Sequence, residues 1–197
     1  KIIEFAECLV DTVASADWAF FAKNGNDGKL IIAEGYMDVI ALHQAGFTNA
    51  VACLGTALTK EQANLLSRYA DTIILSYDAD EAGQKATARA LGIFGTTGME
   101  IKVLHLEGGK DPDEIIKKYG AQRFRDIING AANDTEYRLL RAHQGIDLST
   151  DDGKVKYLSA AAEILAEIGS PVEVDVYASR LAHELGVDKL AIQSQVK

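Results

Sequence analysis

Carboxylates are the side chains in this sequence whose types and spacing most clearly suggest chemistry. They form three short clusters, each with two acids: Glu34 and Asp38, Asp78 and Asp80, and Asp111 and Asp113. Carboxylates that lie close together raise one another's pKa or recruit a cation. All-oxygen ligands select Mg²⁺ or Mn²⁺ over zinc or copper. If the fold brings the clusters together, they predict a magnesium or manganese site.

The elements that must position these acids can be read from the apolar pattern. Short apolar runs predict buried strands, and amphipathic segments between them predict helices. The runs are residues 30–33, 50–54, 72–77 and 101–106, and the segments are 39–46, 59–69 and 81–94. This alternation predicts an α/β fold with a mostly parallel four-stranded sheet flanked by helices. Each acidic cluster follows the carboxyl end of a strand, the edge where such sheets bind ligands.

The strand-like runs stop after Pro112. Asp111 at an N-cap and Pro112 at the first helical position predict that a helix begins there. Further helices are predicted at 121–130, 133–144, 152–168, 171–185 and 188–197. We therefore expect an N-terminal segment over 1–28, an α/β domain over 29–130 and an all-helical subdomain over 131–197.

Several of the acids have simpler alternative roles. For Asp111 the alternative is that it is a helix cap and nothing more. For Asp38 and Asp80 the alternative is a favourable interaction with the positive end of a helix dipole. Glu34 differs because it directly follows four apolar residues, and a buried acid needs a partner. The convergence of three clusters on one edge is the stronger signal.

Composition excludes several protein classes. The chain has 197 residues, 48% of them hydrophobic and 25% charged, which is ordinary globular usage. We find neither an apolar run near the ~20 residues of a membrane helix nor a signal-peptide pattern. The two cysteines cannot build a disulfide framework or a four-ligand zinc site, so a cytoplasmic location is expected. The net charge of −9 argues against coating nucleic acid by charge alone.

Other catalytic constellations are weaker. The four histidines share no metal-ligand spacing, and neither Ser67 nor Ser76 has a histidine near it in the sequence. No phosphate-binding glycine loop follows a predicted strand. Tyr36 and Tyr77 flank the acids and are candidate nucleophiles, with a core or rim role as the alternative.

Four segments resemble the Toprim domain of bacterial DNA primases. They are Glu34-Gly35-Tyr36-Met37-Asp38 with the four residues after it, Leu54-Gly55-Thr56, Tyr77-Asp78-Ala79-Asp80-Glu81-Ala82-Gly83, and Lys110-Asp111-Pro112-Asp113. These primase-type motifs are more specific than the general Toprim pattern, which consists of one Glu and an Asp-x-Asp pair. The resemblance covers residues 29–130 closely. Residues 131–197 look like the helical subdomain of the primase polymerase core, and residues 1–28 match poorly.

The resemblance implies a role for each acid. Asp78 and Asp80 would bind metal, with Glu34 as a further ligand or proton acceptor. Asp38, Asp111 and Asp113 would complete a second metal site or hold its waters. Lys85, Arg89 and Lys110 would face nucleotide or nucleic-acid phosphates, or else belong to a solvated helix face.

The implied activity is that of a DNA primase, a DNA-directed RNA polymerase that makes short RNA primers by nucleotidyl transfer with Mg²⁺ or Mn²⁺, about two ions per site. The implied partners are single-stranded DNA template, NTPs, the RNA primer and a replicative helicase, the last through a region outside this chain. The resemblance also implies a location at the bacterial replication fork and no contact with a membrane. It implies no structural zinc in this chain. Two alternatives remain open: a metal-dependent Toprim nuclease, and a non-catalytic module that binds nucleic acid or a partner. We expect this chain to be inactive alone.

Overall fold

The computed structural model describes residues 28–52, 58–78, 80–106 and 108–196. The chain divides into two compact units between Asp134 and Thr135, close to the predicted boundary after residue 130. Some of the segments discussed above lie outside the described residues: the N-terminal segment up to residue 27, both cysteines (Cys8 and Cys53), the Leu54-Gly55-Thr56 match, and Ala79 between two of the acids.

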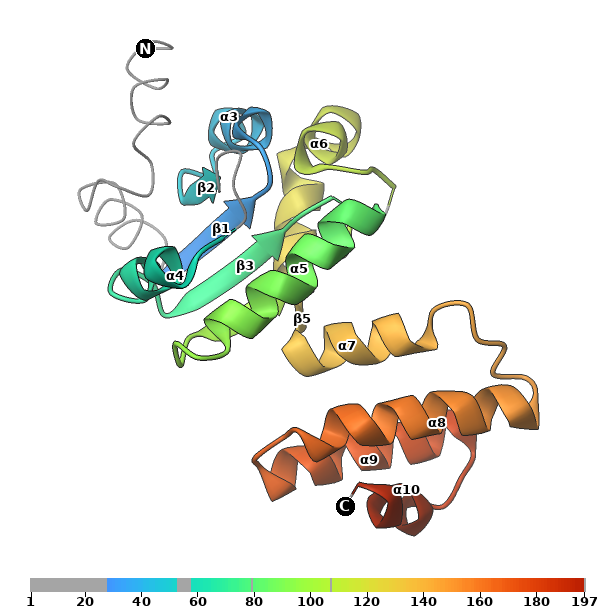
Figure 1. Cartoon of the computed structure of the whole chain (residues 1–197). Coiled ribbons are helices and arrows are strands. Elements are labelled where there is room, and N and C mark those ends of the chain that lie inside the picture. The colour runs from blue at the N-terminus through green and yellow to red at the C-terminus, as the bar shows by residue number, and fades with distance from the viewer. Residues whose placement is uncertain (1–27, 53–57, 79, 107, 197) are drawn as a thin grey trace. The chain divides into compact units, whose positions relative to one another are not determined.

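The first unit is built on a five-stranded sheet (Figure 1). Its strands are β1 (Lys29–Ala33), β2 (Ala50–Ala52), β3 (Thr72–Ser76), β4 (Glu100–Val103) and β5 (Ala132–Asn133), in the order β2-β1-β3-β4-β5. The first four are parallel, which confirms the predicted four-stranded parallel arrangement. The sequence does not predict β5, which pairs antiparallel with β4, because a strand of two residues carries no alternation pattern.

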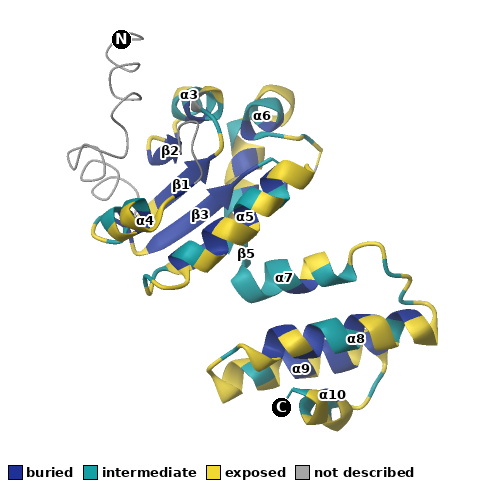
Figure 2. Cartoon of the chain, in the orientation of Figure 1, coloured by how far each residue is buried: buried dark blue, intermediate teal, exposed yellow. Residues whose placement is uncertain are grey.

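Helices cover both faces of this sheet. They are α3 (Tyr36–Gln44), α4 (Lys60–Leu66), α5 (Glu81–Phe94) and α6 (Pro112–Asn129). The face that carries Ile31 and Ile74 packs against α3 and α6 in one apolar cluster. α5 contacts both α4 and β4, and every residue of β3 is buried (Figure 2). Burial on both faces explains why the strands read as continuous apolar runs rather than alternating ones.

The helix ends follow local sequence signals, with two differences from the prediction. The capping box at α4 is present: Gln62 N–H donates to Thr59 Oγ1 at 3.2 Å, and Thr59 N–H donates to Gln62 Oε1 at 2.9 Å. α3 begins at Tyr36 rather than at the predicted residue 39, because Gly35 is already the extended N-cap residue. The helix predicted to open at Pro112 and the one predicted over 121–130 are two halves of α6, split at Gly120, whose φ is +82°.

The second unit is all-helical, as predicted. It contains α7 (Asp134–His143), α8 (Asp151–Ala166), α9 (Pro171–Leu185) and α10 (Lys189–Gln195) around its own apolar core. α9 has the predicted bounds because Ser170 caps its start, Pro171 occupies its first position and Gly186 ends it in the left-handed conformation, with φ +66°.

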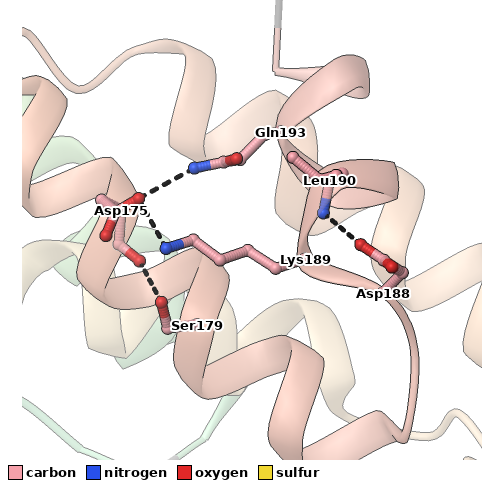
Figure 3. Close-up of polar contacts among 6 residues, drawn as sticks. All are labelled: Asp175, Ser179, Asp188, Lys189, Leu190 and Gln193. Atoms are coloured by element: carbon pink, nitrogen blue, oxygen red, sulfur yellow. Dashed lines mark hydrogen bonds and ion pairs between the residues drawn. The ribbon is translucent and has the colours of Figure 1, made fainter.

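Ion pairs and hydrogen bonds join the helices of this second unit. Asp175 of α9 accepts from Lys189 Nζ at 2.6 Å and from Gln193 Nε2 at 2.9 Å, which fastens α10 to α9 (Figure 3). The hydrogen bond from Lys189 holds the pKa of Asp175 below its ordinary value. A second ion pair, between Arg180 of α9 and Glu136 of α7 at 2.9 Å, joins these two helices. These charged residues therefore have structural partners within the unit.

Candidate acidic active site

The candidate site lies at the carboxyl edge of the parallel strands in the first unit. Ala33, the last residue of β1, is paired with Ser76, the last residue of β3. Glu34 follows the first of these strands directly, and Asp78 follows the second after one intervening residue. The sheet register thus brings two of the three predicted clusters to the same edge, where α/β folds bind ligands.

Asp78 lies at the centre of the site. It is partly buried, and its pKa is raised to about 6, first by burial and then by the charges of four other carboxylates. In decreasing order of effect these belong to Glu34, Asp38, Asp111 and Asp80. The fold therefore brings the three acidic clusters together, which is what the positions of their strands predict.

Asp38 is the second partly buried acid. Its pKa is raised first by burial and then by Asp111, with smaller effects from Asp113 and Glu34. A hydrogen bond from the backbone of Gly35 acts in the opposite direction and stabilises the carboxylate. Gly35 has no side chain to cap α3, so Asp38 reaches back to the start of its own helix.

Asp80 and Asp111 each cap a helix. Asp80 accepts a hydrogen bond of 2.8 Å from the backbone N–H of Gly83 at the start of α5. Asp111 accepts one of 2.7 Å from Glu114 at the start of α6. The capping role considered for Asp111 is therefore present, and Asp80 has one as well. Neither cap uses both carboxylate oxygens, so each acid keeps acceptor capacity for another ligand.

Of the last two acids, Glu34 is exposed and Asp113 is partly buried. We expected Glu34 to be buried and to need a partner because it follows four apolar residues. Its side chain is exposed, so that expectation is wrong. Glu34 still acts on the pKa of Asp78 and of Asp38. Asp113 pairs with Lys117, one turn along α6, at 2.5 Å.

These acids suit a hard divalent cation by charge and donor type. Among the residues that the structure describes, no three His, Cys, Asp or Glu side chains stand in a ready-made metal-binding arrangement. The acids are nevertheless close enough for their charges to raise the pKa of Asp78, and a cation would relieve this repulsion. An oxygen-only donor set of this kind fits Mg²⁺ or Mn²⁺.

The predicted phosphate-facing residues are placed differently from one another. Lys85 is exposed and pairs with Glu81 at 2.6 Å, the contact of a solvated helix face. Arg89 is also exposed, one turn further along α5. Lys110 is exposed beside the third cluster, and its backbone N–H donates to Glu114 at 3.0 Å. Of the three, Lys110 is adjacent in sequence to an acid of the site.

The other candidate residues have ordinary structural roles where they are described. His43 Nε2 lies 3.0 Å from the backbone oxygen of Ala50, and burial lowers its pKa. The ring of His143 lies 5.4 Å from that of Tyr157 in the second unit. Tyr77 is buried, which matches its core alternative. In the described part of the chain, no helix is long and apolar enough to cross a membrane.

Comparison with known proteins identifies the family. A model described as Toprim-like matches residues 31–116, and one described as the DnaB-helicase binding domain of primase matches residues 135–189. A DNA primase of Clostridium acetobutylicum is 44% identical over 173 residues, covering 88% of this chain and 29% of the relative. The chain belongs to the bacterial DnaG-type primase family.

Solved primase structures share this fold. A DNA primase domain from Pseudomonas aeruginosa is 32% identical, with a TM-score of 0.65, over 90% of this chain and 58% of that one. The RNA polymerase domain of Mycobacterium tuberculosis DnaG, in complex with a DNA oligomer, is 29% identical with a TM-score of 0.69, over 85% of this chain and 55% of that one. The chain spans less than a third of the length of the curated primases that it matches.

One comparison differs from the sequence analysis. We expected the helicase contact of a primase to lie outside this chain, whereas the helicase-binding model matches residues 135–189, within the second unit. The apolar and capping pattern of these residues predicts helices but carries no signal for a particular partner.

Proposed function

We propose that this chain carries the catalytic centre of a DNA primase, which synthesises short RNA primers on single-stranded DNA. The observation that supports it most directly is the position of Asp78, whose pKa is raised by burial and by four further carboxylates at the edge of the sheet. Membership of the primase family supports the same reaction. The reaction is nucleotidyl transfer, in which a primer 3′-hydroxyl attacks the α-phosphate of an incoming NTP and pyrophosphate leaves.

The acids divide into two groups in this proposal. Asp78 and Asp80, with Glu34, would hold one Mg²⁺ or Mn²⁺, or Glu34 would accept the proton of the attacking hydroxyl. Asp38, Asp111 and Asp113 would hold the second ion or its waters. Bound cations of this kind stabilise the attacking and the leaving oxygen atoms.

The chain itself supplies position and charge. The caps at Asp80 and Asp111 fix these carboxylates at the starts of α5 and α6, so each is oriented before any substrate binds. Lys110, beside the third cluster, would contact the phosphates of the nucleotide. Lys85 and Arg89 would do so on α5, for which Lys85 must exchange its pairing with Glu81 for a phosphate.

The proposed partners are those of a replication protein at the bacterial fork in the cytoplasm. Template DNA, NTPs and the RNA primer follow from the reaction, and related DnaG domains have been solved with DNA bound. A replicative helicase is proposed as the protein partner, because a helicase-binding model matches residues 135–189. Pull-down of the helicase by residues 135–197, compared with the complete primase, tests whether this unit or another region makes the contact.

The activity is tested by incorporation of labelled NTPs on a single-stranded template, using the complete primase that contains this chain. Asp78→Asn should abolish primer synthesis. The matched control is Asp126→Asn near the end of α6, where the acid accepts from Gln122 at 3.1 Å and lies outside the site; it should retain wild-type synthesis. Template cleavage without incorporation would favour the nuclease alternative. Template binding with neither activity would favour a binding module.

A further inference from the structure

The hydroxyl of Ser76 is a buried polar group at the edge of the site. Ser76 ends β3, and its residue is 1% exposed. Among the residues that the structure describes, none forms a hydrogen bond with its Oγ. A buried hydroxyl without a partner is destabilising, and such groups are rare in folded proteins. No histidine lies near Ser76 in the sequence that would make it a nucleophile.

The direction of the Ser76 side chain follows from the sheet. Alternation along β3 puts Ser76 on the same face as Ile74, the face that packs against α3 and α6. In the sheet, Ala33 is its neighbour on β1. On the other side, Leu104 follows β4 and donates its backbone N–H to Leu75 at 2.9 Å, which puts Leu104 beside Ser76. Both flanking side chains are apolar, so a polar partner must come from the layer above the sheet.

The layer above this end of the strands carries the acids. The first turn of α3 contains Asp38, and α6 begins at the Asp111 cap. Asp38 is partly buried and accepts a hydrogen bond from Gly35, which leaves most of the roughly four acceptor positions of its carboxylate open. Ser76 therefore offers a buried donor below a partly buried acceptor.

We propose that Ser76 is a positioning residue for the acid cluster. Its hydroxyl reaches the carboxylate of Asp38 through one buried water, and the water holds that carboxylate toward the cation. This inference rests on the metal-dependent function proposed above. Groups that orient metal ligands in this way typically change metal affinity by about 10–100-fold when they are removed.

The simpler explanation is that Ser76 is only a small residue that the packing between β3 and the helices requires. The two explanations differ in what Ser76→Ala does. If Ser76 only fills space, alanine is at least as good, and nothing at the acids changes. If Ser76 positions Asp38, alanine removes a destabilising orphan group from the metal-free protein but weakens the binding of the cation.

The test is a titration of the 197-residue chain with Mn²⁺ alone, followed by electron paramagnetic resonance, together with thermal melting without metal. Ser76→Ala should melt at or above the wild-type temperature and bind Mn²⁺ about tenfold more weakly. Ser76→Cys, which keeps the size but donates poorly, should behave in the same way. The control is Thr72→Val at the other end of β3, where Thr72 Oγ1 donates to Glu100 at 2.9 Å. It should lower the melting temperature and leave Mn²⁺ affinity unchanged.

A double-mutant cycle identifies the acid that Ser76 acts on. Asp38→Asn alone should weaken Mn²⁺ binding, and adding Ser76→Ala to it should weaken it no further. Equal Mn²⁺ affinity in Ser76→Ala, Ser76→Cys and the wild type would overturn the role of Ser76 and leave the proposed function standing. Failure of the wild-type chain to bind Mn²⁺ at the acids would overturn the proposed metal centre and this inference with it.

Discussion

Gly83 lies so close to Asp78 that a Cβ atom added to it would stand 2.1 Å from the Asp78 backbone oxygen. The same glycine donates its backbone N–H to Asp80 at 2.8 Å. One residue therefore fixes how α5 begins against the end of β3, and with it the positions of two acids of the site. Thr87 strengthens this turn, because its hydroxyl donates to the Gly83 carbonyl at 2.8 Å.

Gly83→Ala should destabilise the protein by about 3 kcal/mol and abolish primer synthesis, because the backbone that it meets cannot move without shifting Asp78. Urea unfolding of the chain and the incorporation assay measure the two effects. Gly92→Ala is the matched control in the same helix, since a Cβ there meets nothing within 4 Å. It should stabilise the chain by roughly 0.5–1 kcal/mol. Similar stabilities for the two variants would show that the approach of Gly83 to Asp78 imposes no constraint.

Asp80 combines a structural and a proposed catalytic role, and two substitutions separate them. Asp80→Asn keeps an oxygen that can cap α5 but removes the charge, so the melting temperature should stay unchanged or rise while primer synthesis is lost. Asp80→Ala removes the cap as well and should cost about 1 kcal/mol of stability. Thermal melting and NTP incorporation on the same samples measure both effects. Wild-type synthesis by Asp80→Asn would show that Asp80 is a cap alone.

Much of this fold could be predicted from the sequence because its signals are local. The apolar runs of β1 and β3 are short and continuous, and the proline and serine before α9 define its start within one residue. The convergence of the acids was also predictable, since each cluster follows a parallel strand. It required no knowledge of side-chain geometry, only of the edge at which parallel strands end.

The features that the sequence did not predict depend on contacts between distant segments. β5 forms because residues 132–133 pair with β4, and two residues are too few to show the alternation pattern of a strand. The orphan hydroxyl of Ser76 is recognisable only once Ala33 and Leu104 are known to flank it. The exposure of Glu34 is a third case, because an apolar run before an acid does not determine where the chain turns into solvent.

The raised pKa of Asp78 predicts how the stability of the metal-free chain depends on pH. Its pKa rises from the ordinary value of 3.8 to about 6 in the folded state, so between these values the folded chain binds the proton more readily than the unfolded chain. The contribution of Asp78 to the free energy of unfolding is therefore full below the lower value and is lost as the pH rises through about 6. The loss should be on the order of 1 kcal/mol, because Asp78 keeps contact with solvent that screens its neighbours.

Urea unfolding at about pH 5 and about pH 7.5 measures this dependence. Asp78→Asn should reduce the difference between the two conditions, whereas Asp126→Asn, outside the site, should retain it. Mn²⁺ should raise stability mainly at the higher pH, where the acids are charged. A wild-type chain that becomes more stable across this interval would contradict the repulsion on which the proposed metal centre depends.

The last prediction concerns how weakly this chain should hold DNA by itself. Affinity for single strands comes mainly from lysine and arginine side chains that neutralise phosphates. The chain has 20 of these against 29 acids. Three of the basic residues near the third acidic cluster already have contacts. Lys117 pairs with Asp113 at 2.5 Å, Lys118 donates to the Gly108 carbonyl at 3.3 Å, and the Arg125 guanidinium lies 5.2 Å from the centre of the Phe47 ring.

We therefore expect the 197-residue chain to bind single-stranded DNA with a Kd of roughly 10⁻⁴ M or weaker at physiological salt, and to make no primers alone. The complete primase should bind single-stranded DNA more tightly and should make primers, because the chain is less than a third of its relatives' length. Fluorescence anisotropy with a labelled oligonucleotide measures the binding, and Lys117→Ala should change it little because Asp113 already balances that charge. Nanomolar binding by the isolated chain would place a nucleic-acid surface within these residues that their charge does not predict.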